Sequence, residues 1–243
     1  MALIPASIEQ LRREVRRTAA VGRIVATALS DDAYQSCLGR ISAIGRGEAW
    51  PSHAGRPMSA LAQLNLSESS FVPAALAGFA FVSVWLAEDS DGYLIVPDER
   101  SNGDGWEVRA YRALAELEPT DGPGLDGITP SQLEWQIVDD YPDWEDLVEA
   151  VDYDRLQELL EGGESEDVVG ASQNGTKLGG WPSLVQSEIS WAPNGEHPIA
   201  PTYCLQIDTE QRVGLNLWDN GVLHLGLGVE NGRPVWVAES QFM

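Results

Sequence analysis

Five carboxylates lie close together near the middle of the chain and form its densest group of titratable side chains. They are Asp139, Asp140, Asp143, Glu145 and Asp146. Such a group could bind calcium loosely, or raise the pKa of one carboxylate through mutual repulsion. It is also typical of a solvated helix start, because acidic side chains stabilise the first turn of a helix. We favour the helix start, and take the same five side chains as the candidate surface for a basic protein partner.

The usual patterns of metal or covalent chemistry are missing from the sequence. The available zinc ligands are His53, His197, His224, Cys37 and Cys204. They stand far apart, whereas a zinc site needs several ligands at close spacing. Neither a Gly-x-Ser-x-Gly motif nor a phosphate-binding loop occurs, and Gly175-Thr-Lys177 has loop residues in the wrong order. We therefore expect no metal, no cofactor and no catalytic residue, although the many carboxylates leave an undescribed enzyme open.

Two glutamines are placed alike in the two halves of the chain. Gln63 and Gln206 each lie on a predicted strand, with Asn65 or Asp208 two residues later, and a Trp-Pro step precedes each strand. This echo suggests a duplicated strand unit with the glutamines in equivalent positions. Buried glutamines are more often structural hydrogen-bonders than ligand groups. The alternative is a pocket between two repeated sheets, near Gln63, Gln206, Trp181 and Trp218.

The stretch from Gly175 to Gln186 predicts a tight turn. Gly179 and Gly180 can adopt positive φ, and Pro182 fixes the backbone after them. Trp181 between them is expected to tuck under the strand that follows.

Acidic residues dominate the charge of the chain. The formal net charge is −23 on 243 residues, and Glu88–Asp167 carries 25 acids against four arginines. Nucleic acids and anionic membranes are poor partners for such a surface, because phosphate binding depends on Lys and Arg. The charge could steer a basic protein toward the chain, or it could be a solvated face that aids solubility.

Three features of the sequence predict the cellular compartment of the protein. Only Cys37 and Cys204 are present, as expected of a reducing environment, and Met1–Pro5 leads directly into an Arg-rich helix rather than a signal peptide. The longest apolar run, Val72–Ala87, is shorter than the ~20 residues of a membrane-spanning helix. We place the protein in the cytoplasm.

The elements that would position these residues predict an α+β fold: duplicated antiparallel β-sheet units, an N-terminal helix and an acidic helical insert. A capping box at Ser7 and apolar spacing predict a helix over 8–29. Strands are predicted at 61–66, 78–86, 93–96, 106–111, 202–208, 213–218, 222–228 and 234–238, and acidic helices at 143–149 and 152–160. The chain is divided as one domain over 1–243, with a first repeat at 40–115, an acidic insert at 116–174 and a second repeat at 175–243.

Several motifs resemble the YwqG-like family, a bacterial domain of unknown function. In the first half they are Glu48-Ala-Trp-Pro51, Gly55-Arg-Pro57 and Leu61-Ala-Gln-Leu-Asn-Leu-Ser-Glu68. In the second half they are Lys177-Leu-Gly-Gly-Trp-Pro182 with Gln186, Leu205-Gln-Ile-Asp208 and Leu217-Trp-Asp-Asn-Gly221. The chain departs from the family at Thr176, where members often have His, and at Trp218-Asp219, where they have an intervening Gly.

The resemblance implies an α+β fold with a duplicated sheet unit in a bacterial, intracellular setting. No reaction is established for the family, but some members resemble immunity proteins encoded beside toxins. Together with the charge, this favours a non-enzymatic binding protein that neutralises a basic toxin. A small-molecule binder or enzyme with the pocket described above is the alternative, and a domain that contributes only solubility or assembly is a third.

Overall fold

The computed structural model describes residues 6–26, 29–98, 100–151, 154, 156–157, 172–191 and 199–243. Its helices are α1 (Ala6–Val15) and α2 (Trp144–Ala150), with short 3-10 turns at Leu66–Glu68, Ala74–Leu76, Leu114–Glu116 and Gln211–Val213. Its strands are β1 (Arg17–Ala26), β2 (Cys37–Leu38), β3 (Ala43–Gly45), β4 (Ser52–His53), β5 (Arg56–Pro57), β6 (Ser59–Asn65), β7 (Phe81–Leu86), β8 (Trp106–Tyr111), β9 (Leu117–Pro119), β10 (Ser131–Asp140), β11 (Lys177–Gly179), β12 (Thr202–Asp208), β13 (Val222–Glu230) and β14 (Arg233–Gln241).

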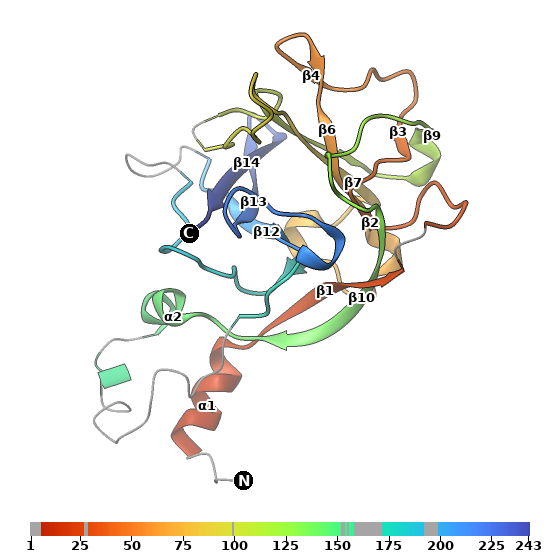
Figure 1. Cartoon of the computed structure of the whole chain (residues 1–243). Coiled ribbons are helices and arrows are strands. Elements are labelled where there is room, and N and C mark those ends of the chain that lie inside the picture. The colour runs from red at the N-terminus through yellow and green to blue at the C-terminus, as the bar shows by residue number, and fades with distance from the viewer. Residues whose placement is uncertain are drawn as a thin grey trace.

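One antiparallel sheet of ten strands forms the body of the protein, in the order β14-β13-β12-β11-β1-β10-β2-β6-β7-β8. The sheet curls until it is nearly closed, like a barrel (Figure 1). Apolar side chains from both ends of this order, such as Val84, Trp106, Leu205 and Leu225, belong to one buried cluster. Burying one face of every strand in a shared core is what holds the curled sheet together.

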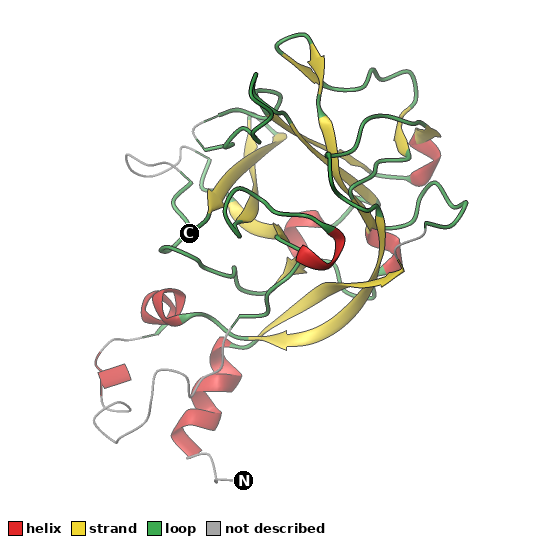
Figure 2. Cartoon of the chain, in the orientation of Figure 1, coloured by secondary structure: helices red, strands yellow, loops and turns green. Residues whose placement is uncertain are grey.

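The predicted α+β fold with duplicated sheets is wrong. The strands of the two predicted repeats, β6 to β8 in the first and β11 to β14 in the second, belong to one sheet because β1, β10 and β2 join them. Strands predominate, and helices are few (Figure 2). The paired strands β1 and β10 lie at the centre of the order, whereas the sequence predicts a helix over β1 and a helical insert that contains β10.

The predicted helix over 8–29 is correct only as far as Val15. From Arg17 the chain forms β1, which pairs with β10 from Arg17 opposite Asp140 to Ala26 opposite Gln132. Val21 and Ile24 are β-branched and favour strands, and Ala19 to Val21 are fully buried. The spacing of apolar residues in this segment also fits a helix, but pairing with β10 on one side and β11 on the other stabilises it as a strand.

The segment predicted as an acidic helical insert contains a ten-residue strand before its first helix. Ser131–Asp140 forms β10, while the helix predicted over 143–149 is confirmed as α2, with Asp143 as its N-cap residue. The helix predicted over 152–160 lies mostly outside the described residues. Both α1 and α2 lie outside the barrel on one side (Figure 1), where Leu11 and Leu147 share a buried cluster.

Most of the remaining strand predictions are confirmed, at least in part, and two are wrong. Strands at 106–111 and 202–208 are confirmed with those bounds, and β6, β7, β13 and β14 overlap their predictions. The segments 93–96 and 213–218 form no strands and contribute only the isolated bridges of Leu94 and Leu215, and Val213 ends a 3-10 turn. The hairpin turn between β13 and β14 is Asn231-Gly232, and both residues have positive φ.

Across the residues that the structure describes, every helix is too short or too polar to cross a lipid bilayer.

Candidate functional site

A buried ion pair lies at the centre of the candidate site. The Nζ of Lys177 on β11 is 3.0 Å from the Oδ2 of Asp140 at the end of β10, and both side chains are 0% exposed. The two residues meet because β1 pairs with β10 on one side and with β11 on the other. Burial lowers the pKa of Lys177, and the Asp140 carboxylate acts against that shift. Lys177 is the only lysine of the chain.

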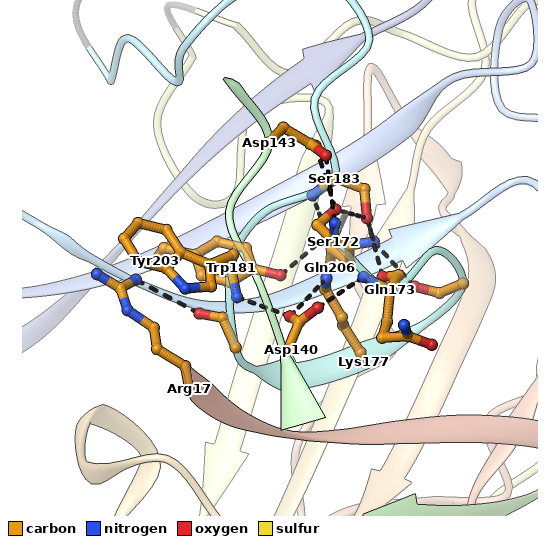
Figure 3. A network of polar contacts seen from close by, with 12 residues as sticks. Arg17, Asp140, Asp143, Ser172, Gln173, Lys177, Trp181, Ser183, Tyr203 and Gln206 are labelled. Atoms are coloured by element: carbon orange, nitrogen blue, oxygen red, sulfur yellow. Dashed lines mark hydrogen bonds and ion pairs between the residues drawn. The ribbon is translucent and has the colours of Figure 1, made fainter. Parts of the chain in front are cut away.

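Backbone amides complete the environment of Asp140 (Figure 3). Its Oδ2 accepts a hydrogen bond from the Trp181 amide at 2.8 Å, and its Oδ1 accepts one from the Gln173 amide at 2.6 Å. Gly180 has φ +73°, and a Cβ there would overlap Asp140 and Ala19. The glycine predicted to make the turn is therefore also required for the close approach of the carboxylate.

The tryptophan of the turn joins this network to α1. Trp181 Nε1 donates to the Val15 carbonyl at 2.7 Å, and the ring packs with Leu11 and Leu147. The ring therefore lies against the two helices rather than under the following strand as predicted. The guanidinium of Arg17 lies 3.2 Å from the Trp181 ring centroid, where burial lowers the pKa of Arg17. A depression of ≈ 310 Å³ opens beside this stacked pair.

Asp143 extends the network toward Ser172 and Ser183. Its carboxylate accepts from the Ser172 amide and hydroxyl, each at 3.2 Å, and from the Leu184 amide at 3.1 Å. The Ser172 hydroxyl lies 3.0 Å from that of Ser183. These bonds point Asp143 toward the loop at 172–184 rather than toward solvent.

Gln206 is fully buried and bonded at both ends of its amide. Its Oε1 accepts from the Ser183 amide at 3.0 Å and the Tyr203 hydroxyl at 2.9 Å. Its Nε2 donates to the Gly175 carbonyl at 3.0 Å and to the Ser183 hydroxyl at 3.0 Å. An amide satisfied in this way holds the loop at 172–184 against β12, which is a structural role.

Gln63 occupies the matching position on the other side of the sheet. It lies opposite Cys37 of β2, as Gln206 lies opposite Lys177 of β11. Its Nε2 donates to the carbonyls of Ala33 and Gln35, at 3.0 and 2.7 Å, and its Oε1 accepts from the Ser42 amide at 2.7 Å. Each glutamine therefore bonds the carbonyl two residues before its strand partner and an amide a few residues after it.

His224 lies beside Gln206 in the sheet and is 0% exposed. Its Nε2 is 3.1 Å from the Ser183 carbonyl, and burial lowers the pKa of the ring to about 4. Within the described residues, its Nδ1 has no hydrogen-bond partner. The ring is therefore neutral at physiological pH and serves to hold the loop at 172–184.

The four side chains of the predicted pocket do not converge. Gln63 and Gln206 are fully buried and bonded, and Trp181 borders the depression beside α1. Trp218 instead lines a separate depression of ≈ 400 Å³ with Tyr93 and Leu94. The pocket predicted between two repeated sheets is thus replaced by two depressions on different parts of the sheet.

The structure also separates the five candidate carboxylates. Asp140 is buried, and the half-buried Asp143 directs its carboxylate to the amides and hydroxyl of the loop at 172–184. Asp139 is 54% exposed and forms an ion pair of 3.3 Å with Arg16. Glu145 is exposed and borders a third depression, of ≈ 420 Å³, while Asp146 is half-buried.

Sequence reasoning missed Lys177 and Arg17 as members of the site. The sequence does contain a signal for Lys177. A chain with 38 acidic residues and a single lysine does not use lysine as a general surface residue, so that lysine is a candidate for a specific role. Arg17 had no signal, since the residues around it were predicted as helix. The residues brought together hold a loop and two strands in place through hydrogen bonds and one ion pair within the fold.

Within the described residues, no group of three His, Cys, Asp or Glu side chains is close enough to hold a metal ion. None of the curated proteins matches the chain. A family model described as "Domain of unknown function (DUF1963)" matches residues 38–227, which run along the chain from β2 to β13. The match includes Asp140, Lys177 and Trp181, whereas Arg17 and the rest of β1 lie before it. The chain therefore belongs to the DUF1963 family of domains of unknown function.

Proposed function

We propose that this protein binds a basic protein partner and has no catalytic activity. The observation that carries the proposal is the net charge of −23 on a chain whose only lysine is fully buried. Apart from His, arginine is therefore the only cationic side chain available at the surface. Several arginines are paired with carboxylates in the structure, including Arg16, Arg100, Arg109 and Arg212.

A surface of this kind favours association with a positively charged protein. Opposite charges raise the rate of encounter and suppress partners of the same charge, even where each ion pair adds little affinity. Because of the YwqG-like motifs, the specific role that we propose is that of an immunity protein that binds and neutralises a basic toxin. Assignment to that family, the bacterial setting and the role in immunity are parts of this proposal.

The candidate surface differs from the five carboxylates of the sequence. It keeps Asp139 and Glu145, which are exposed, and adds Glu134, another exposed acid of β10. Because electrostatic steering acts over distance, these side chains need not lie on one face of the strand. Asp140 and Asp143 are excluded because their carboxylates are bonded within the fold.

The test begins with capture of the partner by the tagged full-length chain, identification by mass spectrometry and measurement of both rate constants. Neutralising Glu134, Asp139 and Glu145 to their amides should slow association about three- to tenfold, with a smaller change in dissociation. A matched control neutralises three exposed acids elsewhere: Asp31, Glu116 and Glu230. A partner with no excess of Lys and Arg, or equal loss in both variants, would contradict the proposal.

A further inference from the structure

A depression of ≈ 400 Å³ lies where three connections of the barrel meet, and it is independent of the network around Asp140. Its apolar lining includes Leu94 of the segment after β7, Ile128 of the segment before β10, and Leu215 and Trp218 of the segment before β13. Tyr93 completes the aromatic part of the lining. This volume lies within the range of sites that take a small ligand or one inserted side chain.

The depression is held in shape by bonds between its walls. Trp218 has φ +53°, its Nε1 donates to the Leu94 carbonyl at 3.2 Å, and its ring lies 5.9 Å from that of Phe242. A Cβ at Gly214, which has φ +80°, would overlap the Gly127 carbonyl, so these two connections touch directly. A site whose walls are fixed before binding loses little conformational entropy when it is filled.

Tyr93 is presented at the rim on a rigid turn. Its amide donates to Asp89 Oδ1 at 3.0 Å, and its carbonyl accepts from the Asp89 amide at 2.8 Å. Its side chain is nevertheless 72% exposed. A large aromatic side chain held outward by an ordered backbone is typical of a contact residue in a binding site.

The charge around the depression is negative. Glu88 and Asp126 belong to its lining, and no Arg, Lys or His is present among the described lining residues. Glu88 Oε1 accepts from the Ser59 hydroxyl at 3.3 Å. Arg56 donates to the Glu88 carbonyl at 2.9 Å but does not line the depression. Two aromatic residues and two acidic residues thus line a space to which none of the described lining residues brings a cation.

The chain contains a filled counterpart of this arrangement. The guanidinium of Arg109 lies 5.2 Å from the Trp85 ring centroid, and its nitrogens contact the carboxylates of Glu107 and Glu48. A planar guanidinium suits such a site because it stacks on an aromatic face and donates to carboxylates at its edges.

We infer that the depression at Trp218 binds an arginine side chain presented by the partner. The inference rests on the proposed function, since the basic partner supplies the arginine. In this arrangement the guanidinium of that arginine stacks on the rings of Tyr93 and Trp218 and forms ion pairs with the carboxylates of Glu88 and Asp126. Arginine fits better than lysine because an ammonium lacks the flat face and the forked donors of the guanidinium.

The probe for the test is a fluorescein-labelled Gly-Ser-Arg-Ser-Arg-Ser-Gly peptide, titrated with the full chain and followed by anisotropy. The same peptide with citrulline in place of arginine keeps the shape and removes the charge. We expect the citrulline peptide to bind at least about tenfold more weakly, and the lysine peptide to fall between the two.

Variants at exposed positions locate the site without disturbing the core. Tyr93→Ala should weaken binding of the arginine peptide about fivefold, whereas Tyr93→Phe, which keeps the ring, should bind like the parent chain. Asp126→Asn should weaken it about threefold. Asp91→Asn is the matched control, because Asp91 is exposed on the same turn as Tyr93 but does not line the depression.

Equal binding of the citrulline peptide would overturn the inference, as would equal losses in Asp91→Asn and Asp126→Asn. Failure of this inference is distinguishable from failure of the proposed function. If Tyr93→Ala has no effect but the basic partner still binds and responds to the Glu134, Asp139 and Glu145 variant, only the arginine site is wrong. If no basic partner binds, the proposed function fails, whatever the peptide does.

Discussion

Replacing Lys177 by methionine should lower the free energy of unfolding by about 3–5 kcal/mol, because it leaves a buried carboxylate without its counter-charge. Both side chains of the Lys177–Asp140 pair are 0% exposed, so water does not reach the carboxylate. The amides of Trp181 and Gln173 would still donate to Asp140, at 2.8 and 2.6 Å. These two bonds lessen the loss without replacing the charge.

The companion change, Asp140→Asn, removes the carboxylate and leaves the ammonium of Lys177 buried. Its expected cost is also about 3–5 kcal/mol, by the same reasoning. Combining Lys177→Met with Asp140→Asn buries no charge, and the remaining cost is one poorly matched amide, about 1–3 kcal/mol. The double variant should therefore be more stable than either single variant.

Equilibrium unfolding in urea measures these differences, followed by tryptophan fluorescence and by circular dichroism. The nine tryptophans give a strong signal, and coincidence of the two probes tests two-state behaviour. A double variant less stable than both single variants would refute the reasoning. A decrease in the free energy of unfolding of less than about 1 kcal/mol for Lys177→Met would also refute it, because removing one partner of a fully buried ion pair leaves an uncompensated buried charge.

Two further changes test other parts of the network. Between pH 6.5 and pH 4 the unfolded chain takes up a proton that folded His224, with its pKa lowered to about 4, does not. Stability should therefore fall by up to about 3 kcal/mol as pH falls through this window, and His224→Gln should remove this contribution. The comparison of the two pH profiles is needed because burial raises the pKa of Asp208, which acts in the opposite direction; identical profiles would contradict the assignment. Gly180→Ala should cost at least about 2 kcal/mol more than Gly47→Ala in urea unfolding, since the two glycines have φ +73° and +71° but only the Cβ at Gly180 would meet other atoms. Equal costs would show that the contact with Asp140 is unimportant.

The strands with clear alternation could be predicted from the sequence. Thr202–Asp208 and Trp106–Tyr111 carry β-branched and aromatic side chains, and both form strands with the predicted bounds. The segment Arg17–Ala26 could not be assigned in this way, because its apolar spacing fits a helix and a strand equally well. Only its two partner strands, β10 and β11, decide between them.

The error at β10 also explains the error in the candidate site. Gln132, Leu133, Glu134 and Trp135 alternate between polar and apolar, which is the pattern of a strand. On a strand, adjacent side chains point to opposite faces, so Asp139 and Asp140 cannot share a surface. The structure has one exposed and the other buried. The pairing of Asp140 with Lys177, 37 residues away, depends on the register of three strands and carries no local signal.

The proposed function is tested most directly by the association rate constant of the captured partner, measured at 50 and at 300 mM salt. Steering by opposite charges predicts a fall of about tenfold or more across this range, and a smaller fall for the chain neutralised at Glu134, Asp139 and Glu145. An association rate that does not change with salt, or that falls equally in both chains, would contradict binding through the acidic surface.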